Sequence, residues 1–149
     1  MRRSACLPAL AAAFIAFAAP AAALARSPFV LFFETGGTAI DTYGNAVLDN
    51  AAAASLQLDA RELLVIAHAD RVGSEADNLR LSHRRAEAVR AALVRRGVPI
   101  ERIRIQAHGE SRPMVQTADG VAELQNRTAW VIMQRMCNPP PGDPRAGNC

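Results

Sequence analysis

The sequence predicts an α/β chain, folded as an α+β sandwich in the order β-α-β-α-β-β, with two helices packed on a small mixed sheet. Three observations support this prediction. Two long segments repeat apolar residues at helical spacing, four short segments have the length and pattern of strands, and the two kinds alternate until the last strand. Strands joined through a helix should run parallel, whereas the last strand, with no helix before it, is free to run antiparallel.

The four predicted strands differ in their apolar pattern. The first is short and aromatic and ends at the turn Thr35-Gly36-Gly37, and the second is a continuous apolar run, typical of a strand buried on both faces. The third alternates arginine with isoleucine, which indicates a half-buried strand, and the fourth contains the only tryptophan, Trp130. In chain order the predicted strands are Phe29–Phe33, Leu63–Ala67, Arg102–Gln106 and Thr128–Met133.

Two helices are predicted between the first three strands. Residues Ala46–Leu58 combine good helix formers with an apolar stripe. The longer helix, Glu75–Arg96, keeps most of its arginines off its apolar stripe. Gly97 is placed to end this helix, and Pro99 prevents its continuation. The apolar residues of its stripe are Leu81, Ala86, Val89 and Leu93.

The first 25 residues have the features of a signal peptide. Arg2 and Arg3 form a positive start, an alanine-rich apolar run follows, and Ala23-Leu24-Ala25 offers the small residues that a signal peptidase reads. Cys6 precedes the apolar run, whereas a lipid-modified cysteine would follow it. We therefore expect cleavage after Ala25 and export without a lipid anchor, the alternative being an uncleaved N-terminal anchor.

The rest of the chain is expected to form one domain over residues 28–136 and a proline-rich, irregular tail over residues 137–149. No segment after the leader approaches the roughly 18 uninterrupted apolar residues of a membrane span. Cys137 and Cys149 either pair in an oxidising compartment or remain two thiols or an intermolecular bridge. Without Arg2 and Arg3 the formal charge falls from +3 to +1, which argues against nucleic acid as a partner.

Four polar residues follow the second strand or lie on the second helix. Asp70 comes just after the strand, and Asn78, Ser82 and Arg85 share one face of the helix beyond a turn at Gly73. They should converge where the strand ends and the helix begins, where ligands of open α/β sheets usually bind. We expect a partly exposed carboxylate and guanidinium there, a bipolar receptor for a ligand with both an ammonium and a carboxylate group.

The pattern D-x-x-G-x(4)-N-x-x-L-S-x-x-R-A-x-x-V, from Asp70 to Val89, resembles the OmpA-like peptidoglycan-binding domain, the OmpA/MotB C-terminal family. Two later motifs match in the expected order, Gly109-Glu110-Ser111-Arg112-Pro113 and Asn126-Arg127. The resemblance covers roughly residues 29–135. The family includes porin-like outer-membrane proteins, the peptidoglycan-associated lipoprotein and the flagellar stator protein. The resemblance implies the βαβαββ fold already expected from the residues.

The resemblance also implies a function and a location. The domains of this family bind the diaminopimelate stem peptide of peptidoglycan. The resemblance implies that Asp70 binds the ammonium group of that ligand and that Arg85 binds its carboxylate group. Asn78 matches the family's asparagine beside the pocket, and we include Ser82 from the same helix face. The expected location is the periplasm, with outer-membrane association and envelope proteins as further partners. No cofactor, metal or catalytic residue is implied.

Two departures from the family pattern bear on the ligand. Ala67-His68-Ala69-Asp70 stands where Gly-His-Thr-Asp is common, so a hydroxyl at the pocket edge is lost. Asn126-Arg127-Thr128 replaces the usual Asn-Arg-Arg, which weakens any inference about charge near the last strand.

Other interpretations stay open. Asp70 and Arg85 could be an ion pair that braces the helix against the sheet, with Asn78 and Ser82 satisfying backbone groups. A scaffold that binds another protein without wall affinity fits the same pattern. A metal hydrolase would use His68, His108 and Asp70, but these residues lack close metal-ligand spacing. We expect His68 to be a packed, hydrogen-bonded strand residue and Glu110 to fix the loop that follows the third strand.

Overall fold

A computed structural model describes residues 28–58 and 60–134 of the chain. The predicted leader and tail, with Cys6, Cys137 and Cys149, lie outside the described residues.

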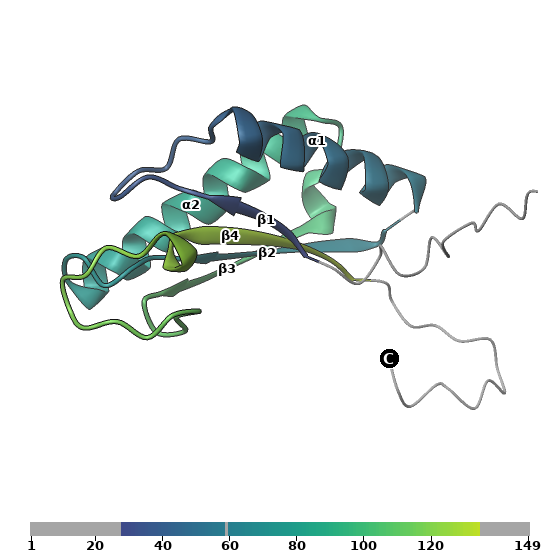
Figure 1. Cartoon of the computed structure of the whole chain (residues 1–149). Helices are drawn as coiled ribbons and strands as arrows, with labels where there is room; N and C mark the ends of the chain where they lie inside the picture. The colour runs from purple at the N-terminus through teal and green to yellow at the C-terminus, as the bar shows by residue number, and fades with distance from the viewer. Residues whose placement is uncertain (1–27, 59, 135–149) are drawn as a thin grey trace, which may run out of the picture.

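Two helices cover one face of a four-stranded sheet (Figure 1). This is the predicted element order, and the predicted fold class is confirmed. Short 3-10 turns at Ile100–Arg102 (η2) and Leu124–Asn126 (η3) precede the third and fourth strands. The main elements are β1 (Phe29–Phe32), α1 (Thr42–Gln57), β2 (Glu62–His68), α2 (Glu75–Arg95), β3 (Ile103–Gly109) and β4 (Thr128–Gln134).

The first helix begins four residues earlier than predicted. The Asp41 side chain accepts a hydrogen bond of 2.7 Å from the backbone N–H of Gly44, so it caps a helix that starts at Thr42. The prediction started at Ala46 because apolar spacing is clear only from there, and it overlooked the aspartate as a cap. Apolar periodicity therefore located the helix but not its first turn.

The last strand lies inside the sheet. The strand order is β1-β4-β2-β3, with β2 parallel to β3 and with β4 antiparallel to both of its neighbours. The strands joined through helices thus run in one direction and the last strand runs against them, as predicted. In register, Ala129 of β4 faces Leu31 on one side and Ala67 on the other. The start of β4 therefore lies at the same sheet edge as the end of β2.

The core lies between the helices and one face of the sheet. Leu63, Val65 and Ala67 of β2 are fully buried under the helices. The prediction that this strand is buried on both faces is wrong, because Leu64 and Ile66 are only half-buried on the face that no helix covers. The predicted stripe of α2 is confirmed: its four apolar residues are all buried.

Gly109, at the end of β3, lets the strand approach the backbone of α2. Its φ is +53°, and a Cβ atom there would lie 3.0 Å from the backbone nitrogen of Leu79. The register between β2 and β3 shifts at this point, where His68 pairs with Gly109. The contact positions the N-terminal half of α2 over the ends of two strands.

Gly109→Ala is expected to lower the free energy of unfolding by about 2–3 kcal/mol, because it combines a left-handed backbone with a steric clash. Gly97→Ala is the matched control: its φ is +89°, but nothing lies within 4 Å of the added methyl. The control should lose about 1 kcal/mol. Urea unfolding measures both, and equal losses would contradict the close approach of β3 to α2.

Candidate functional site

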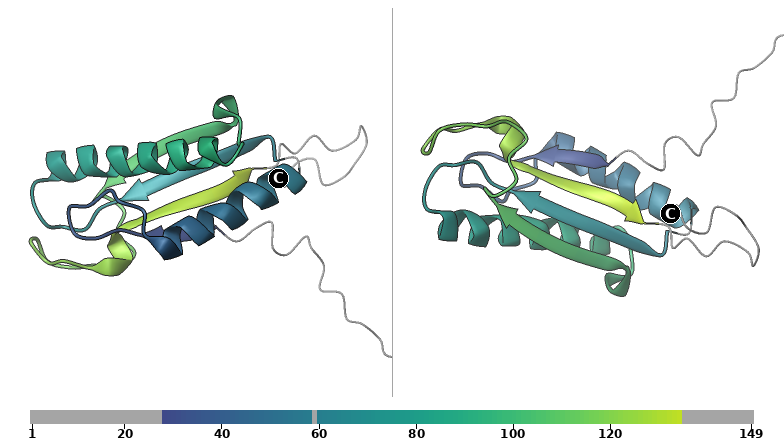
Figure 2. Two further views of the ribbon diagram at one scale, coloured as in Figure 1. Left: turned by 90° about the horizontal axis from the view of Figure 1, so that it is seen from above. Right: turned by 90° about the horizontal axis from the view of Figure 1, so that it is seen from below.

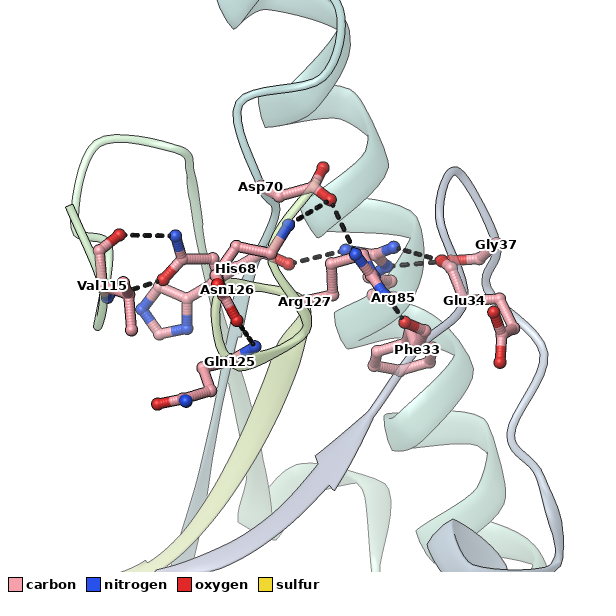
Figure 3. Close-up of polar contacts among 11 residues, drawn as sticks. Phe33, Glu34, Gly37, His68, Asp70, Arg85, Val115, Gln125, Asn126 and Arg127 are labelled. Atoms are coloured by element: carbon pink, nitrogen blue, oxygen red, sulfur yellow. Dashed lines mark hydrogen bonds and ion pairs between the residues drawn. The ribbon is translucent and has the colours of Figure 1, made fainter. Parts of the chain in front are cut away.

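Asp70 and Arg85 lie at the junction between the end of β2 and α2 (Figure 3). The turn between them contains Gly73 at φ +101°, and α2 begins after Ser74, whose hydroxyl accepts a hydrogen bond from the N–H of Asp77. Sequence reasoning placed both charged residues at this junction, and the structure brings them there. The arrangement around each charge differs from the expected one.

Arg85 is fully buried and donates to three backbone carbonyls. Its Nε bonds Gly37 at 2.8 Å, its Nη2 bonds Glu34 at 2.9 Å and its Nη1 bonds His68 at 2.9 Å. The guanidinium also lies 4.9 Å from the centre of the Phe33 ring, a cation–π contact. One side chain thus fastens the loop between β1 and α1 to the end of β2.

The expectation that Asp70 and Arg85 are partly exposed is wrong. Asp70 is 2% exposed and Arg85 is 0% exposed. The cause is the turn after β1, in which the Gly37 N–H bonds the Glu34 carbonyl and both residues direct carbonyls at the guanidinium. No side-chain pattern in that loop predicts that its backbone carbonyls bind an arginine some fifty residues later in the sequence.

The direct ionic partner of Asp70 is Arg127. The carboxylate Oδ2 lies 3.0 Å from Nη1 of Arg127 and accepts a longer bond, 3.4 Å, from the N–H of Glu123. Arg127 also donates through Nε to the Phe33 carbonyl at 2.9 Å. Sequence reasoning did not assign this arginine to the site. The available clue was its place just before a strand that runs antiparallel to β2, because such a residue falls at the end of β2.

The junction holds one carboxylate and two guanidinium groups. Burial lowers the pKa of Arg85 to about 10, the Asp70 carboxylate acts in the opposite direction, and Arg127 and Arg84 lower the pKa further. Arg85 therefore stays protonated near neutral pH. With Arg127 also charged, the cluster formed by Asp70, Arg85 and Arg127 has an excess of positive charge, which favours an additional anionic group. We call these three residues the charged junction.

Asn78 and Ser82 bond the end of β3 and the turn that follows it. Asn78 donates to the Glu110 carboxylate at 2.6 Å, and Ser82 accepts from the N–H of Gly109 at 2.9 Å while donating to the Leu79 carbonyl. Both side chains are buried. Their hydrogen bonds position β3 on α2 and do not reach Asp70 or Arg85. The expectation that Glu110 fixes this loop is confirmed.

His68 and His108 lie side by side, with ring centres 5.5 Å apart. Asp70, the third residue of the hydrolase interpretation, has its carboxylate on Arg127 instead. In residues 28–58 and 60–134 no group of three or more histidine, cysteine, aspartate or glutamate side chains is arranged to hold a metal ion. His68 is a packed strand residue, as predicted, and its backbone carbonyl accepts from Arg85; its ring Nδ1 has no hydrogen-bond partner among the described residues.

The fold and the charged junction define an α+β domain with a buried charged cluster at a strand–helix junction. The model of the OmpA family matches residues 32–127, more than half of the chain. The chain belongs to the OmpA family.

Curated relatives share the matching region. The chain is 35% identical over 103 residues to the peptidoglycan-associated lipoprotein of Rhizobium meliloti, which covers 69% of this chain and 58% of that protein. It is 29% identical over 96 residues to outer membrane protein A of Bordetella avium, which covers 64% of this chain and 50% of that protein. The chain thus spans between half and three fifths of the length of these two relatives.

Solved structures share the fold. The peptidoglycan-associated lipoprotein of Burkholderia pseudomallei matches with a TM-score of 0.65 at 28% identity, over 70% of this chain and 89% of that one. The C-terminal domain of Helicobacter pylori MotB matches with a TM-score of 0.60 at 21% identity, over 75% of this chain and 87% of that one, and shows the fold alone. Neither helix of the described residues is long and apolar enough to cross a membrane.

Arg85→Lys is expected to lower the free energy of unfolding by about 2–4 kcal/mol, because an ammonium group cannot reach three carbonyls arranged around a planar guanidinium. Arg84→Lys, the same change at the exposed neighbour, should have little effect. Urea unfolding of both variants makes the comparison. If the two losses are alike, Arg85 does not hold the loop to β2.

Stability should fall as the pH is lowered from 7 to 4. Burial lowers the pKa of His68 from 6.5 to about 4, with His108 and Arg112 lowering it further. The unfolded chain then binds more protons than the folded one between these values, so up to about 2–3 kcal/mol is lost across that window.

Urea unfolding at several pH values measures this loss. His68→Gln should flatten the pH dependence, and His83→Gln, at an exposed position on α2, should leave it unchanged. A His68→Gln protein with the full wild-type dependence would show that other groups cause it.

Proposed function

We propose that this protein binds peptidoglycan non-covalently in the periplasm and thereby anchors or organises the cell envelope. The observation that supports this most directly is the charged junction, a buried cluster with excess positive charge at the end of β2, in a chain of the OmpA family. Two similar proteins are named as peptidoglycan-associated lipoproteins, which supports the same class of ligand. The shorter length of this chain leaves the relatives' other activities outside the proposal.

We propose the diaminopimelate stem peptide as the ligand. The free end of its diaminopimelate side chain carries an ammonium and a carboxylate group on one carbon atom. The carboxylate would be attracted by the positive excess of Arg85 and Arg127, and the ammonium by Asp70. The exposed Glu34 carboxylate, on the loop that covers Arg85, would add a second negative group for the ammonium.

Access to Arg85 requires movement of that loop. The carbonyls of Glu34 and Gly37 occupy two donors of the guanidinium, and residues 34–36 are exposed. We propose that a ligand carboxylate replaces one or both carbonyls, so that the exchange conserves hydrogen bonds at Arg85. Asn78 and Ser82 would then act by positioning α2 against β3 rather than by touching the ligand.

A scaffold without wall affinity remains a second candidate, and one observation favours it. Each nitrogen of the Arg85 guanidinium already donates within the protein, so the arginine has a structural role that needs no ligand. Ala69, which stands where the family commonly has a threonine hydroxyl, is also buried, and its side chain offers no polar atom. For both candidates we propose binding rather than catalysis.

Co-sedimentation with purified diaminopimelate-type sacculi tests the proposal. The wild-type protein should sediment. Asp70→Asn should lower the affinity for sacculi by about tenfold or more, because it removes the charge opposite the ligand ammonium. Asp49→Asn makes the same change at an exposed position of α1 and should bind like the wild type. Circular dichroism establishes that each variant is folded.

The same assay distinguishes wall binding from a scaffold role, and it tests whether diaminopimelate is the recognised group. Sacculi whose stem peptide carries lysine lack the side-chain carboxylate, so they should retain much less protein than diaminopimelate-type sacculi. Wild-type protein that stays in the supernatant would favour the scaffold. Equal binding to both wall types would reject diaminopimelate as the recognised group, and a folded Asp70→Asn variant with full binding would reject the charged junction as the site.

A further inference from the structure

The sheet face opposite the helices contains a hollow near the ends of β2 and β3. The right-hand view of Figure 2 shows this face, which neither α1 nor α2 covers. The hollow has a volume of about 370 Å³ and lies between the sheet and the turn that follows β3. It is lined by Ile66, His68, His108 and Trp130 of the strands and by residues 112–114 of the turn.

Three buried polar atoms around this hollow have no partner among the described residues. They are Nδ1 of His68, Nε2 of His108 and Nε1 of Trp130, half of the six such side-chain atoms in residues 28–58 and 60–134. The His68 ring lies 5.5 Å from the His108 ring and 5.7 Å from the Trp130 ring. His68 is 8% exposed, so its unpaired nitrogen is a buried group at the hollow. Buried polar groups are normally hydrogen-bonded, so this concentration points to missing hydrogen-bond partners, and for the indole N–H the missing partner is an acceptor.

The charge around the hollow has one sign. Arg112 lines the hollow, is exposed, and has no hydrogen bond or ion pair with the part of the chain that the structure describes. No aspartate or glutamate lines the hollow. The indole N–H, the arginine and the histidines are all able to donate hydrogen bonds, and the remaining lining from Ile66 and Met114 is apolar.

We propose that this hollow is a second binding site, for a carboxylate attached to a flat apolar body. The carboxylate would accept from the Trp130 indole N–H, from the histidines and from Arg112, and the apolar body would lie against Ile66 and Met114. Two sources carry this chemistry: a free aromatic acid, and the terminal carboxylate of a polypeptide that ends in an aromatic residue. The volume suits one such group.

The site is separate from the charged junction and does not rest on wall binding. His68 contributes to both places through different atoms: its backbone carbonyl accepts from Arg85, and its ring lies on the side of the strand away from that guanidinium (Figure 3). The junction lies beside the loop after β1, and the hollow lies beneath the turn after β3. A failure of the protein to bind sacculi would therefore leave the second site untouched.

Protonation should be coupled to occupancy. The charged or titratable groups around His68 are His108 on β3 and Arg112 on the following turn, while β4 presents the uncharged Trp130. Burial and Arg112 lower the pKa of both histidines, and His108 lowers that of His68 further; a bound carboxylate would act in the opposite direction. Binding should then take up protons and become tighter as the pH falls from 7 to 5.

The single tryptophan of the chain provides the measurement. In ¹H–¹⁵N spectra of the purified protein, benzoate should shift the Trp130 indole resonance in a saturable manner, and its neutral analogue benzamide should not. Arg112→Gln should weaken benzoate binding about tenfold or more. Arg104→Gln removes the same charge from an exposed position of β3 outside the hollow and should bind benzoate like the wild type.

A competition experiment with a peptide distinguishes a free aromatic acid from the terminal carboxylate of a polypeptide. A short peptide that ends in phenylalanine with a free carboxylate should compete with benzoate if the hollow accepts chain ends, and its C-terminal amide should not compete. Benzoate binding without peptide competition would assign the hollow to free aromatic acids. No indole shift with benzoate, an equal shift with benzamide, or unchanged affinity in Arg112→Gln would each overturn the proposal.

Discussion

A guanidinium group removed from water must find hydrogen-bond acceptors inside the protein, and the arrangement of this domain follows from how Arg85 meets that requirement. Its acceptors are backbone carbonyls of Glu34, Gly37 and His68, which come from two segments far apart in the sequence. Because carbonyls carry no net charge, the arginine keeps its positive charge within a buried setting. The same contacts therefore hold the loop after β1 in place and leave the positive charge of Arg85 unneutralised by its direct partners.

The second arginine of the charged junction, Arg127, bonds a carboxylate as well as a backbone carbonyl. Arg127 precedes β4, and its Nε and Nη1 atoms join the Phe33 carbonyl to the Asp70 carboxylate. The ends of β1 and β2 are thus connected through the residue that leads into the strand between them. Stability and charge at the junction have a common origin, because the groups that would attract a ligand also hold three sheet segments in place.

Much of the fold could be predicted because apolar spacing is a local property. The buried stripe of α2 and the parallel direction of strands joined by helices follow from residues close in sequence. The burial of Arg85 could not be predicted, since it depends on carbonyls whose direction is set by the turn at Gly36-Gly37. Asp70 was placed correctly but its ionic partner was missed, because the position of β4 between β1 and β2 is a property of the sheet as a whole.

That position also determines the order in which the chain can fold. β2, α2 and β3 form a continuous unit with parallel pairing, but β1 and α1 have no edge to join until residues 128–134 have been synthesised. β1 can therefore pair only with a strand that is synthesised about a hundred residues later. Contacts between residues so far apart in the sequence slow folding. The closed domain can therefore form only when nearly all of its residues are available, because its first strand pairs with its last.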